Sequence, residues 1–284
     1  MVPGTSSGFF KRADAPALYY RLHLSANPKG VVCLIHGFAE HSGRYEELAA
    51  KLARAGFDCI RYDLRGHGRS DGKPADVERF DAYAQDQREL VEYLRRQQLI
   101  PACALHIVAH SMGALIALQY GASHPENVAS LVLSSPCLAV ALRTPLKIAA
   151  RVVSMLIPGF YFKQPVAAAQ LSHDAGKVRE YLEDPLIHKR ISARLLGAMM
   201  REGDRLSEKS LVLTVPFLMM LAGSDRIVDN AKSLSFYERL RAPQKKILVL
   251  EGQRHEIFNE VEREKVYDSV LSFLIRIPAE CSHS

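Results

Sequence analysis

Short apolar runs alternate along the chain with segments whose apolar residues recur at helical spacing. The runs are typical of buried strands and fall at residues 31–35, 58–63, 105–108, 128–134, 215–221 and 246–250. The helical patterns cover residues 46–56, 83–97, 114–122, 230–241 and 262–277. Residues 8–14 and 17–24 are expected to open the fold as two antiparallel strands. This alternation predicts an α/β protein with an eight-stranded, mostly parallel sheet and helices on both faces.

One long segment, residues 138–207, breaks the alternation. Its pattern is largely helical and contains no clear strand. We therefore expect a core made of residues 1–137 and 208–284, with residues 138–207 inserted as a helical cap. The most apolar part of the segment, residues 152–162, is too short to span a bilayer. We interpret it as a buried cap helix that Pro158 ends.

Ser111 lies between the strand at 105–108 and the helix at 114–122, within the pattern A-x-S-x-G. A serine on a sharp strand-to-helix turn has its hydroxyl lifted above the sheet, beside the positive end of the helix dipole. Ala109 stands where glycine is usual in this pattern, and adds only a methyl group. A serine between small residues is often only a turn, so the interpretation depends on finding its partners.

Two candidate partners follow Ser111 in the chain, each in the loop after a predicted strand. Asp225, with Asp229 as the reserve candidate, follows the strand at 215–221, and His255 follows the strand at 246–250. A serine hydroxyl needs a base within hydrogen-bond reach, and the base needs a third group to orient it. Individually these residues could be a capping aspartate and a surface histidine. Their order, Ser–Asp–His, predicts a catalytic triad.

A nucleophilic serine also needs N–H donors for the negative charge that develops on the attacked oxygen. Met112, directly after the serine, is one candidate, and Phe38, in the loop after the strand at 31–35, is the other. His36 in the same loop is interpreted as a structural histidine that bonds the loop and not as the base.

With these residues in place, the chain resembles the monoacylglycerol lipase and lysophospholipase family. The resemblance spans nearly the whole chain and is carried by L-I-H-G-F-A-E-H-S-G-R-Y at 34–45, D-L-R-G-H-G-R-S at 63–70, H-S-M-G at 110–113, D-P-L-I-H at 184–188, G-S-D at 223–225 and the His255 loop. It implies an α/β-hydrolase fold with a helical cap. It also implies a serine hydrolase that cleaves single-chain acyl esters through an acyl-enzyme on Ser111.

The family likeness implies further site residues. Ser111, Asp225 and His255 would be the triad, with the oxyanion held by the N–H groups of Phe38 and Met112. Glu40 and Arg44 match family positions near the alcohol end of the substrate, where they would bind substrate or form an ion pair that fixes the loop. Two departures are Ala114, in place of a usual glycine, and Phe258, where monoacylglycerol lipases can carry a histidine. Under this resemblance, residues 152–162 could instead line an acyl pocket or touch lipid aggregates.

The net charge is +6, and residues 138–207 hold eleven Lys/Arg against six Asp/Glu. Most such charge forms a solvated helix face. The alternative is that the cap draws the enzyme to anionic lipid surfaces or phosphate headgroups as a peripheral membrane contact. A nucleic-acid partner is not expected, because the sequence contains no binding motif or interleaved aromatics.

Five scattered cysteines suggest reduced thiols and a cytoplasmic location. Residues 1–11 lack the apolar region of a signal peptide. Neither a cofactor nor a metal is expected. Three rival interpretations arise: another serine hydrolase of the same fold (a general esterase, a thioesterase or an aminopeptidase), an inactive ligand-binding relative, and a haloalkane dehalogenase. A dehalogenase would require a carboxylate at position 111.

Overall fold

The computed structural model describes residues 4–164, 166–208 and 210–279. Its main sheet has eight strands in the order β1-β2-β4-β3-β5-β6-β9-β10. Neighbours from β4 to β10 run parallel, whereas β2 is antiparallel to both β1 and β4. This confirms the predicted α/β-hydrolase sheet. The strands are β1 (Gly4–Phe10), β2 (Leu18–Leu24), β3 (Gly30–Ile35), β4 (Phe57–Tyr62), β5 (Leu105–His110), β6 (Val128–Ser134), β9 (Phe217–Ala222) and β10 (Lys245–Leu250).

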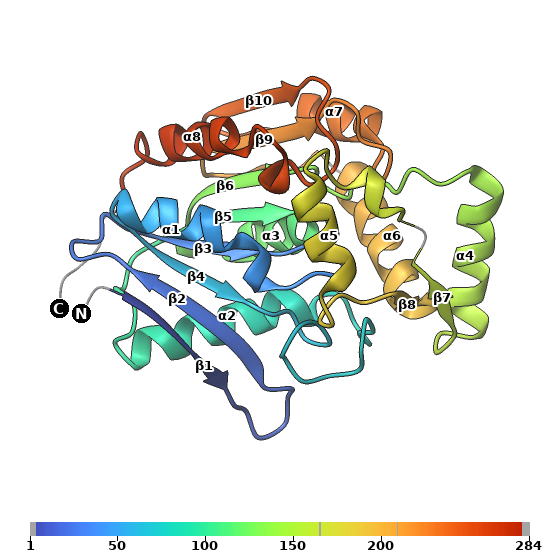
Figure 1. Ribbon diagram of the computed structural model, residues 1–284, viewed down its shortest axis with the longest axis horizontal. Helices are drawn as coiled ribbons and strands as arrows, with labels where there is room; N and C mark the ends of the chain where they lie inside the picture. Colours follow the sequence, from blue (N-terminus) through green and yellow to red (C-terminus); the bar gives the residue numbers. More distant parts are fainter. Residues whose placement is uncertain (1–3, 165, 209, 280–284) are drawn as a thin grey trace.

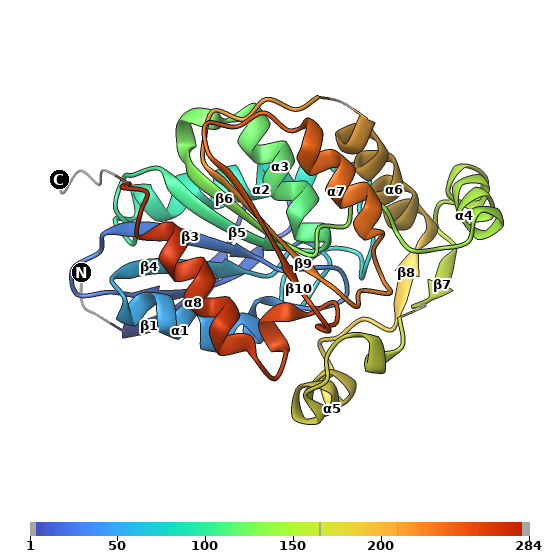
Figure 2. The same ribbon diagram turned by 90° about the horizontal axis from the view of Figure 1, so that it is seen from above.

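Helices cover both faces of the sheet (Figures 1 and 2). They are α1 (Glu46–Arg54), α2 (Ala82–Arg96), α3 (Met112–Ser123), α7 (Asn230–Arg239) and α8 (Arg263–Leu274). Because side chains alternate along a strand, Cys33 and Ile35 of β3 pack into the cluster with α2, α3 and α7. Val32 and Leu34 pack into the second cluster, with α1 and α8. Short 3-10 turns occur at Ser42–Tyr45, Pro125–Asn127 and Ile257–Asn259.

The first strand begins earlier than the sequence pattern predicted. β1 starts at Gly4, where the chain pairs with Leu24 of β2, and ends at Phe10. Its first residues are exposed and polar. Backbone hydrogen bonds to β2 form this edge strand, and its first residues do not alternate between apolar and polar, so the sequence pattern did not reveal where it begins.

The segment between β6 and β9 lies beside the carboxyl ends of the parallel strands (Figure 1). Its elements are α4 (Thr144–Leu156), β7 (Tyr161–Lys163), the turn Ala168–Gln170, α5 (Ala175–Glu183), β8 (Arg190–Ser192) and α6 (Ala193–Glu208). The expectation that it contains no strand was wrong, since β7 and β8 form an antiparallel ladder. Each is three residues long and pairs with a distant segment, so neither produces a readable pattern.

The expectation of a buried apolar helix at residues 152–162 was also wrong. α4 ends at Leu156, ahead of Pro158, and among its residues only Ala150 and Ser154 are buried. Met155 and Leu156 are 77% and 75% exposed, and Val152, Ile157 and Phe160 are exposed as well. The helix packs against α6, and most of its apolar side chains remain exposed to solvent. In the part of the chain that the structure describes, no helix has both the length and the apolarity to cross a bilayer.

The expectation of reduced thiols holds for three cysteines and fails for one. Cys33, Cys59 and Cys137 are free and buried, and burial raises the pKa of Cys33 and Cys137 to about 12. Cys103 is disulfide-bonded. Cys281 lies outside the described residues. Pairing of thiols depends on which distant segments meet in the fold, so the scattered spacing did not reveal it.

Candidate active site

Ser111 occupies the turn between β5 and α3. Its φ of 51° and ψ of −114° lie in a region that residues other than glycine rarely adopt. Its N–H donates to the Ser134 carbonyl at 2.9 Å. A Cβ on Gly113 would lie 2.6 Å from the His36 carbonyl oxygen and 2.7 Å from that of Ile35. The helix start is therefore pressed against β3, and the close approach requires glycine at position 113.

His255 connects Ser111 to Asp225. Its Nε2 lies 3.0 Å from Ser111 Oγ, and its Nδ1 lies 2.7 Å from Asp225 Oδ2. All three residues are buried or nearly so. Burial raises the pKa of Asp225, but the adjacent His255 and the N–H donors of Ile227 and Val228 outweigh it, so the pKa lies below its ordinary value. A carboxylate that stays ionised can orient an imidazole and stabilise its protonated form.

The two candidate aspartates have separate tasks. Asp225 Oδ1 accepts from the Ile227 and Val228 N–H groups, which leaves Oδ2 for His255. Asp229 is the N-cap of α7 and accepts from Ala231 and Lys232. The structure thus brings Asp225, and not the reserve candidate, to the histidine.

The loop after β3 lies close to Ser111. A Cβ on Gly37 would come within 3.2 Å of Ser111 Cβ. Phe38 follows in this loop and lines the cavity at the serine, and Met112 is the first residue of α3. Of the two residues predicted to hold an oxyanion, Met112 therefore adjoins the serine in the chain, and Phe38 lies in a loop that passes close to it.

His36 is a structural residue, as expected. Its Nδ1–H donates to the Gly37 carbonyl at 2.7 Å, and its Nε2 accepts from the Leu64 N–H at 2.9 Å. Burial lowers its pKa to about 3. A neutral imidazole with both nitrogens engaged cannot serve as the base for Ser111.

A cavity of about 240 Å³ opens at Ser111 and His255. Much of its wall is apolar, and the apolar lining comes from both the core and the inserted segment. It includes Val140, Leu142, Ile191, Leu196, Met199 and Ile227. Polar residues also line the cavity, namely Glu40, Gln164, Gln170, Tyr181 and Glu256. The site can therefore hold an apolar chain together with a compact polar group.

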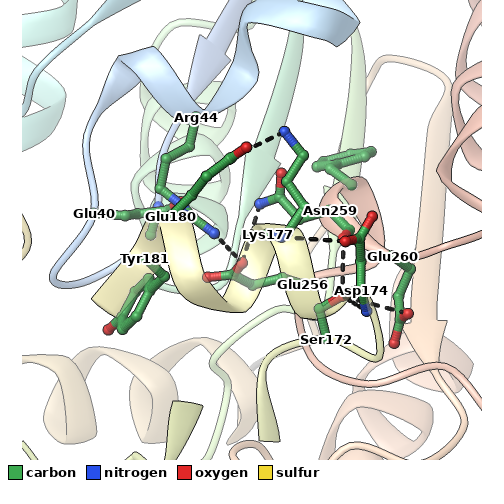
Figure 3. Close-up of polar contacts among 12 residues, drawn as sticks. Glu40, Arg44, Ser172, Asp174, Lys177, Glu180, Tyr181, Glu256, Asn259 and Glu260 are labelled. Atoms are coloured by element: carbon green, nitrogen blue, oxygen red, sulfur yellow. Dashed lines mark hydrogen bonds and ion pairs between the residues drawn. The ribbon is translucent and has the colours of Figure 1, made fainter. Parts of the chain in front are cut away.

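Glu40 and Arg44 belong to a buried ionic cluster with Glu256 (Figure 3). Arg44 Nε lies 3.3 Å from Glu40 Oε2, and its Nη2 donates to Glu256 Oε2. Glu40 Oε1 accepts from the Gly37 N–H at 2.6 Å and from the Tyr45 hydroxyl at 2.7 Å. Glu40 lines the cavity, whereas Arg44 lies behind it, with its guanidinium 5.1 Å from the ring centre of Tyr181 in α5.

Electrostatics differ between the members of this cluster. Burial and the neighbouring Glu256 raise the pKa of Glu40, although Arg44 opposes the change. Burial lowers the pKa of Arg44, but its two carboxylate neighbours outweigh that effect and raise it overall. One guanidinium therefore serves two buried carboxyl groups, so a further negative charge would be unfavourable beside Glu40 and Glu256.

Sequence reasoning missed Glu256, which follows His255 directly. Its place beside a predicted catalytic histidine was the available signal, but only the fold shows its contact with Arg44, 212 positions away. Phe258 is buried and packs against His110 and Tyr45, with ring centres 6.5 and 6.1 Å apart. Phe258 therefore packs beneath the loop that carries His255 and is not among the residues that line the cavity.

Comparison with known proteins agrees with this geometry. Residues 26–262 match the Hydrolase_4 family model, described as serine aminopeptidase, S33. The chain is 32% identical to a monoacylglycerol lipase of Mycolicibacterium smegmatis, over 88% of this chain and 89% of the relative. It is 30% identical to human monoglyceride lipase, over 88% of this chain and 83% of that protein.

A solved structure shows the same likeness. The crystal structure of the monoacylglycerol lipase from Paleococcus ferrophilus superposes with a TM-score of 0.80 at 27% identity, covering 91% of this chain and 98% of that one. The family match at residues 26–262 includes the Ser111, Asp225 and His255 loops. The chain therefore belongs to the Hydrolase_4 (serine aminopeptidase, S33) family of α/β-hydrolases and resembles its monoacylglycerol lipases.

Proposed function

We propose that the protein is a carboxylic ester hydrolase that cleaves single-chain acyl lipids, monoacylglycerol or lysophospholipid, through an acyl-enzyme on Ser111. The observation that carries the proposal is the hydrogen-bonded series Ser111–His255–Asp225 at the wall of a largely apolar cavity. The names of its relatives, monoacylglycerol and monoglyceride lipases, support the same class of substrate.

The proposed reaction has two acyl transfers. His255 Nε2 takes the proton of Ser111 as Oγ attacks the ester carbonyl, and the Phe38 and Met112 N–H groups stabilise the oxyanion. His255 then gives the proton to the leaving alcohol. Water, deprotonated by His255, attacks the acyl-enzyme, and the fatty acid leaves as Ser111 regains its proton.

The wall chemistry suggests how the substrate lies. The acyl chain would follow the apolar wall formed partly by residues 138–207, which we propose to be a cap on a core of residues 1–137 and 208–284. The alcohol would lie near Glu40 and Glu256, with Glu40 and Arg44 in the substrate-binding region. Because this region has two carboxyl groups for one guanidinium, a neutral alcohol such as glycerol fits it better than a phosphate.

The exposed apolar residues of α4 and the excess of basic residues in the same segment support a peripheral contact with lipid surfaces. We place the enzyme in the cytoplasm, at or near a membrane. The free buried thiols agree with that location, whereas the bonded Cys103 argues against a fully reduced chain. Cell fractionation tests this.

A paired hydrolysis assay tests the function. Wild type and Ser111→Ala are compared on 1-monoacylglycerol and lysophosphatidylcholine of the same chain length. We expect wild type to cleave the monoacylglycerol faster, and Ser111→Ala to cleave neither. Cleavage of only a short activated ester, or of an aminoacyl amide, would instead favour a general esterase or an aminopeptidase. No cleavage at all would favour an inactive ligand-binding protein.

A further inference from the structure

A stretch of the inserted segment runs along the loop that carries His255. We call residues 170–174 the strap and residues 251–260 the histidine loop. The His255 N–H donates to the Gln170 carbonyl at 3.4 Å, and the Glu256 N–H donates to the Leu171 carbonyl at 2.8 Å. The strap thus binds the backbone of the histidine itself and of the next residue.

Ser172 adds a side-chain contact to this pairing. It is 2% exposed, and its hydroxyl donates to the Asn259 carbonyl at 2.8 Å. The Ser172 carbonyl in turn accepts from Arg254 Nη1 at 3.0 Å. Ser172 therefore binds the histidine loop on both sides of His255, at Arg254 and at Asn259.

Glu260, the last residue of the histidine loop, contacts Ser172 of the strap (Figure 3). Its carboxylate accepts from the N–H groups of Arg254 at 2.9 Å and Val261 at 3.1 Å. It also accepts from the His173 N–H at 3.1 Å and contacts His173 Nδ1 at 2.9 Å. Its side chain is only 3% exposed, so these N–H groups take the place of water as its hydrogen-bond donors.

The strap is itself anchored to the core. Asp174 caps α5 through the Gly176 and Lys177 N–H groups and binds Arg263, the first residue of α8, at 2.9 Å. One turn further on, Lys177 binds Glu47 of α1 at 2.7 Å. The core side of the histidine loop has its own contact, from the Ser135 hydroxyl to the His255 carbonyl at 2.9 Å.

We propose that Ser172 and Glu260 are positioning residues that hold His255 against Ser111, so that the inserted segment takes part in catalysis as well as enclosing the acyl chain. The inference rests on the proposed function. His255 must keep two hydrogen bonds at once, one at each ring nitrogen, and a displacement of about 1 Å in a catalytic group costs about a hundredfold in rate. Gln170 and Leu171 also line the cavity, so the strap touches the substrate region while it fixes the base.

The test uses Ser172→Ala and Glu260→Gln in the full chain. Both variants keep the cavity wall unchanged and remove contacts to the histidine loop. We expect kcat to fall about tenfold or more for a short soluble ester and for a lipid alike, while KM stays near the wild-type value. A substitution that affected only lipid binding would raise KM for the lipid and spare the short ester.

A second readout does not depend on the substrate. The rate at which an alkyl fluorophosphonate labels Ser111 reports how well His255 activates the serine, and it should fall in parallel with kcat. If wild type is labelled but cleaves no acyl ester, the proposed function is wrong. The labelling rates of wild type and the two variants then still test whether Ser172 and Glu260 position His255. If wild type is not labelled, Ser111 is not activated and both ideas fail.

Ser207→Ala is the matched control. Ser207 is a buried serine of the same inserted segment, but its hydroxyl donates to the Asp204 carbonyl within α6, away from the histidine loop. It should label and turn over like wild type. The inference is overturned if the two strap variants match Ser207→Ala in kcat and labelling, or if their losses only follow a lower folded fraction in thermal melts. Should Glu260→Gln fail to fold, Ser172→Ala decides.

Discussion

At the scale of single residues, the backbone of Ser111 is held in a costly conformation by its surroundings. Its positive φ persists because β5 fixes the residue before it and the start of α3 is pressed against the β3 carbonyls. The strain is therefore stored at the residue proposed as nucleophile. Gly113 makes this possible, since any side chain there would push the two elements apart.

Gly113→Ala tests this close approach. The added Cβ would meet two backbone oxygens at under 3 Å, and backbone cannot yield as a flexible side chain can. We expect turnover of a short ester to fall about a hundredfold through displacement of Ser111, with a loss of about 1–3 kcal/mol in unfolding free energy. Gly159→Ala, where a Cβ meets open space, is the control and should behave as wild type. Equal activity of the two variants would contradict the argument.

The two loop aspartates offer a second prediction. Asp225→Asn should lower kcat about ten-thousandfold, because an amide cannot fix the His255 tautomer or stabilise its protonated form. Asp229→Asn should leave kcat and stability unchanged, because asparagine caps a helix as well as aspartate does. Steady-state kinetics on both proteins checks this, and a large loss in the Asp229 variant would reverse the assignment.

At the scale of elements, α4 differs from the helices that cover the sheet. Those helices bury an apolar face, whereas α4 exposes most of its own. An exposed apolar patch of this kind is typical of surfaces that bind a membrane or another protein. Most of the segment's excess of basic residues lies in and beside α4, since residues 138–163 hold four Lys/Arg and no Asp/Glu, which would favour an anionic membrane.

Replacing Met155 and Leu156 by serine should weaken binding to lipid vesicles. Each side chain contributes roughly 1.5–3 kcal/mol when it moves from water into an apolar phase, so the pair should reduce partitioning by at least about a hundredfold. Vesicle sedimentation measures this, and hydrolysis of a short soluble ester should stay unchanged. Ile275→Ser, at a residue after α8 that is 59% exposed, is the control. If the double variant binds vesicles as strongly as wild type, α4 is not the surface that contacts lipid.

At the scale of the whole molecule, buried ionisable groups make stability depend on pH. Glu40 has a folded pKa raised above its ordinary value of 4.5. Its folded form therefore holds the proton more tightly than the unfolded chain does. The stability it contributes is present below pH 4.5 and is lost as the pH rises through the folded pKa.

Glu40→Gln should remove this loss. The unfolding free energy of the variant, relative to wild type, should increase as the pH rises from about 4.5 to 8, by on the order of 1 kcal/mol for each unit of raised pKa. Urea unfolding across this range measures the difference, with the 85%-exposed Glu78→Gln as control. A difference that is constant with pH would show that Glu40 titrates in the folded protein as it does in the unfolded chain.

Much of the fold was readable from the sequence. The buried parallel strands form continuous apolar runs, and the strand at 128–134 was predicted to the residue. Ser111, Asp225 and His255 were readable because each follows such a strand, and the carboxyl ends of parallel strands meet at one edge of the sheet. The β7–β8 ladder and the early start of β1 were not readable, because backbone pairing between distant segments makes them.

By itself, then, the sequence determined the alternation that builds the sheet, the order of the three site residues and the family to which they belong. The tertiary structure decided the rest: α4 faces solvent, Glu256 meets Arg44, Cys103 is bonded and the strap holds the histidine loop. The physical reason is the range of the interactions. Hydrophobic periodicity and turn chemistry are local and recur along the chain, whereas exposure and ionic pairing depend on which distant segments meet once the chain has packed.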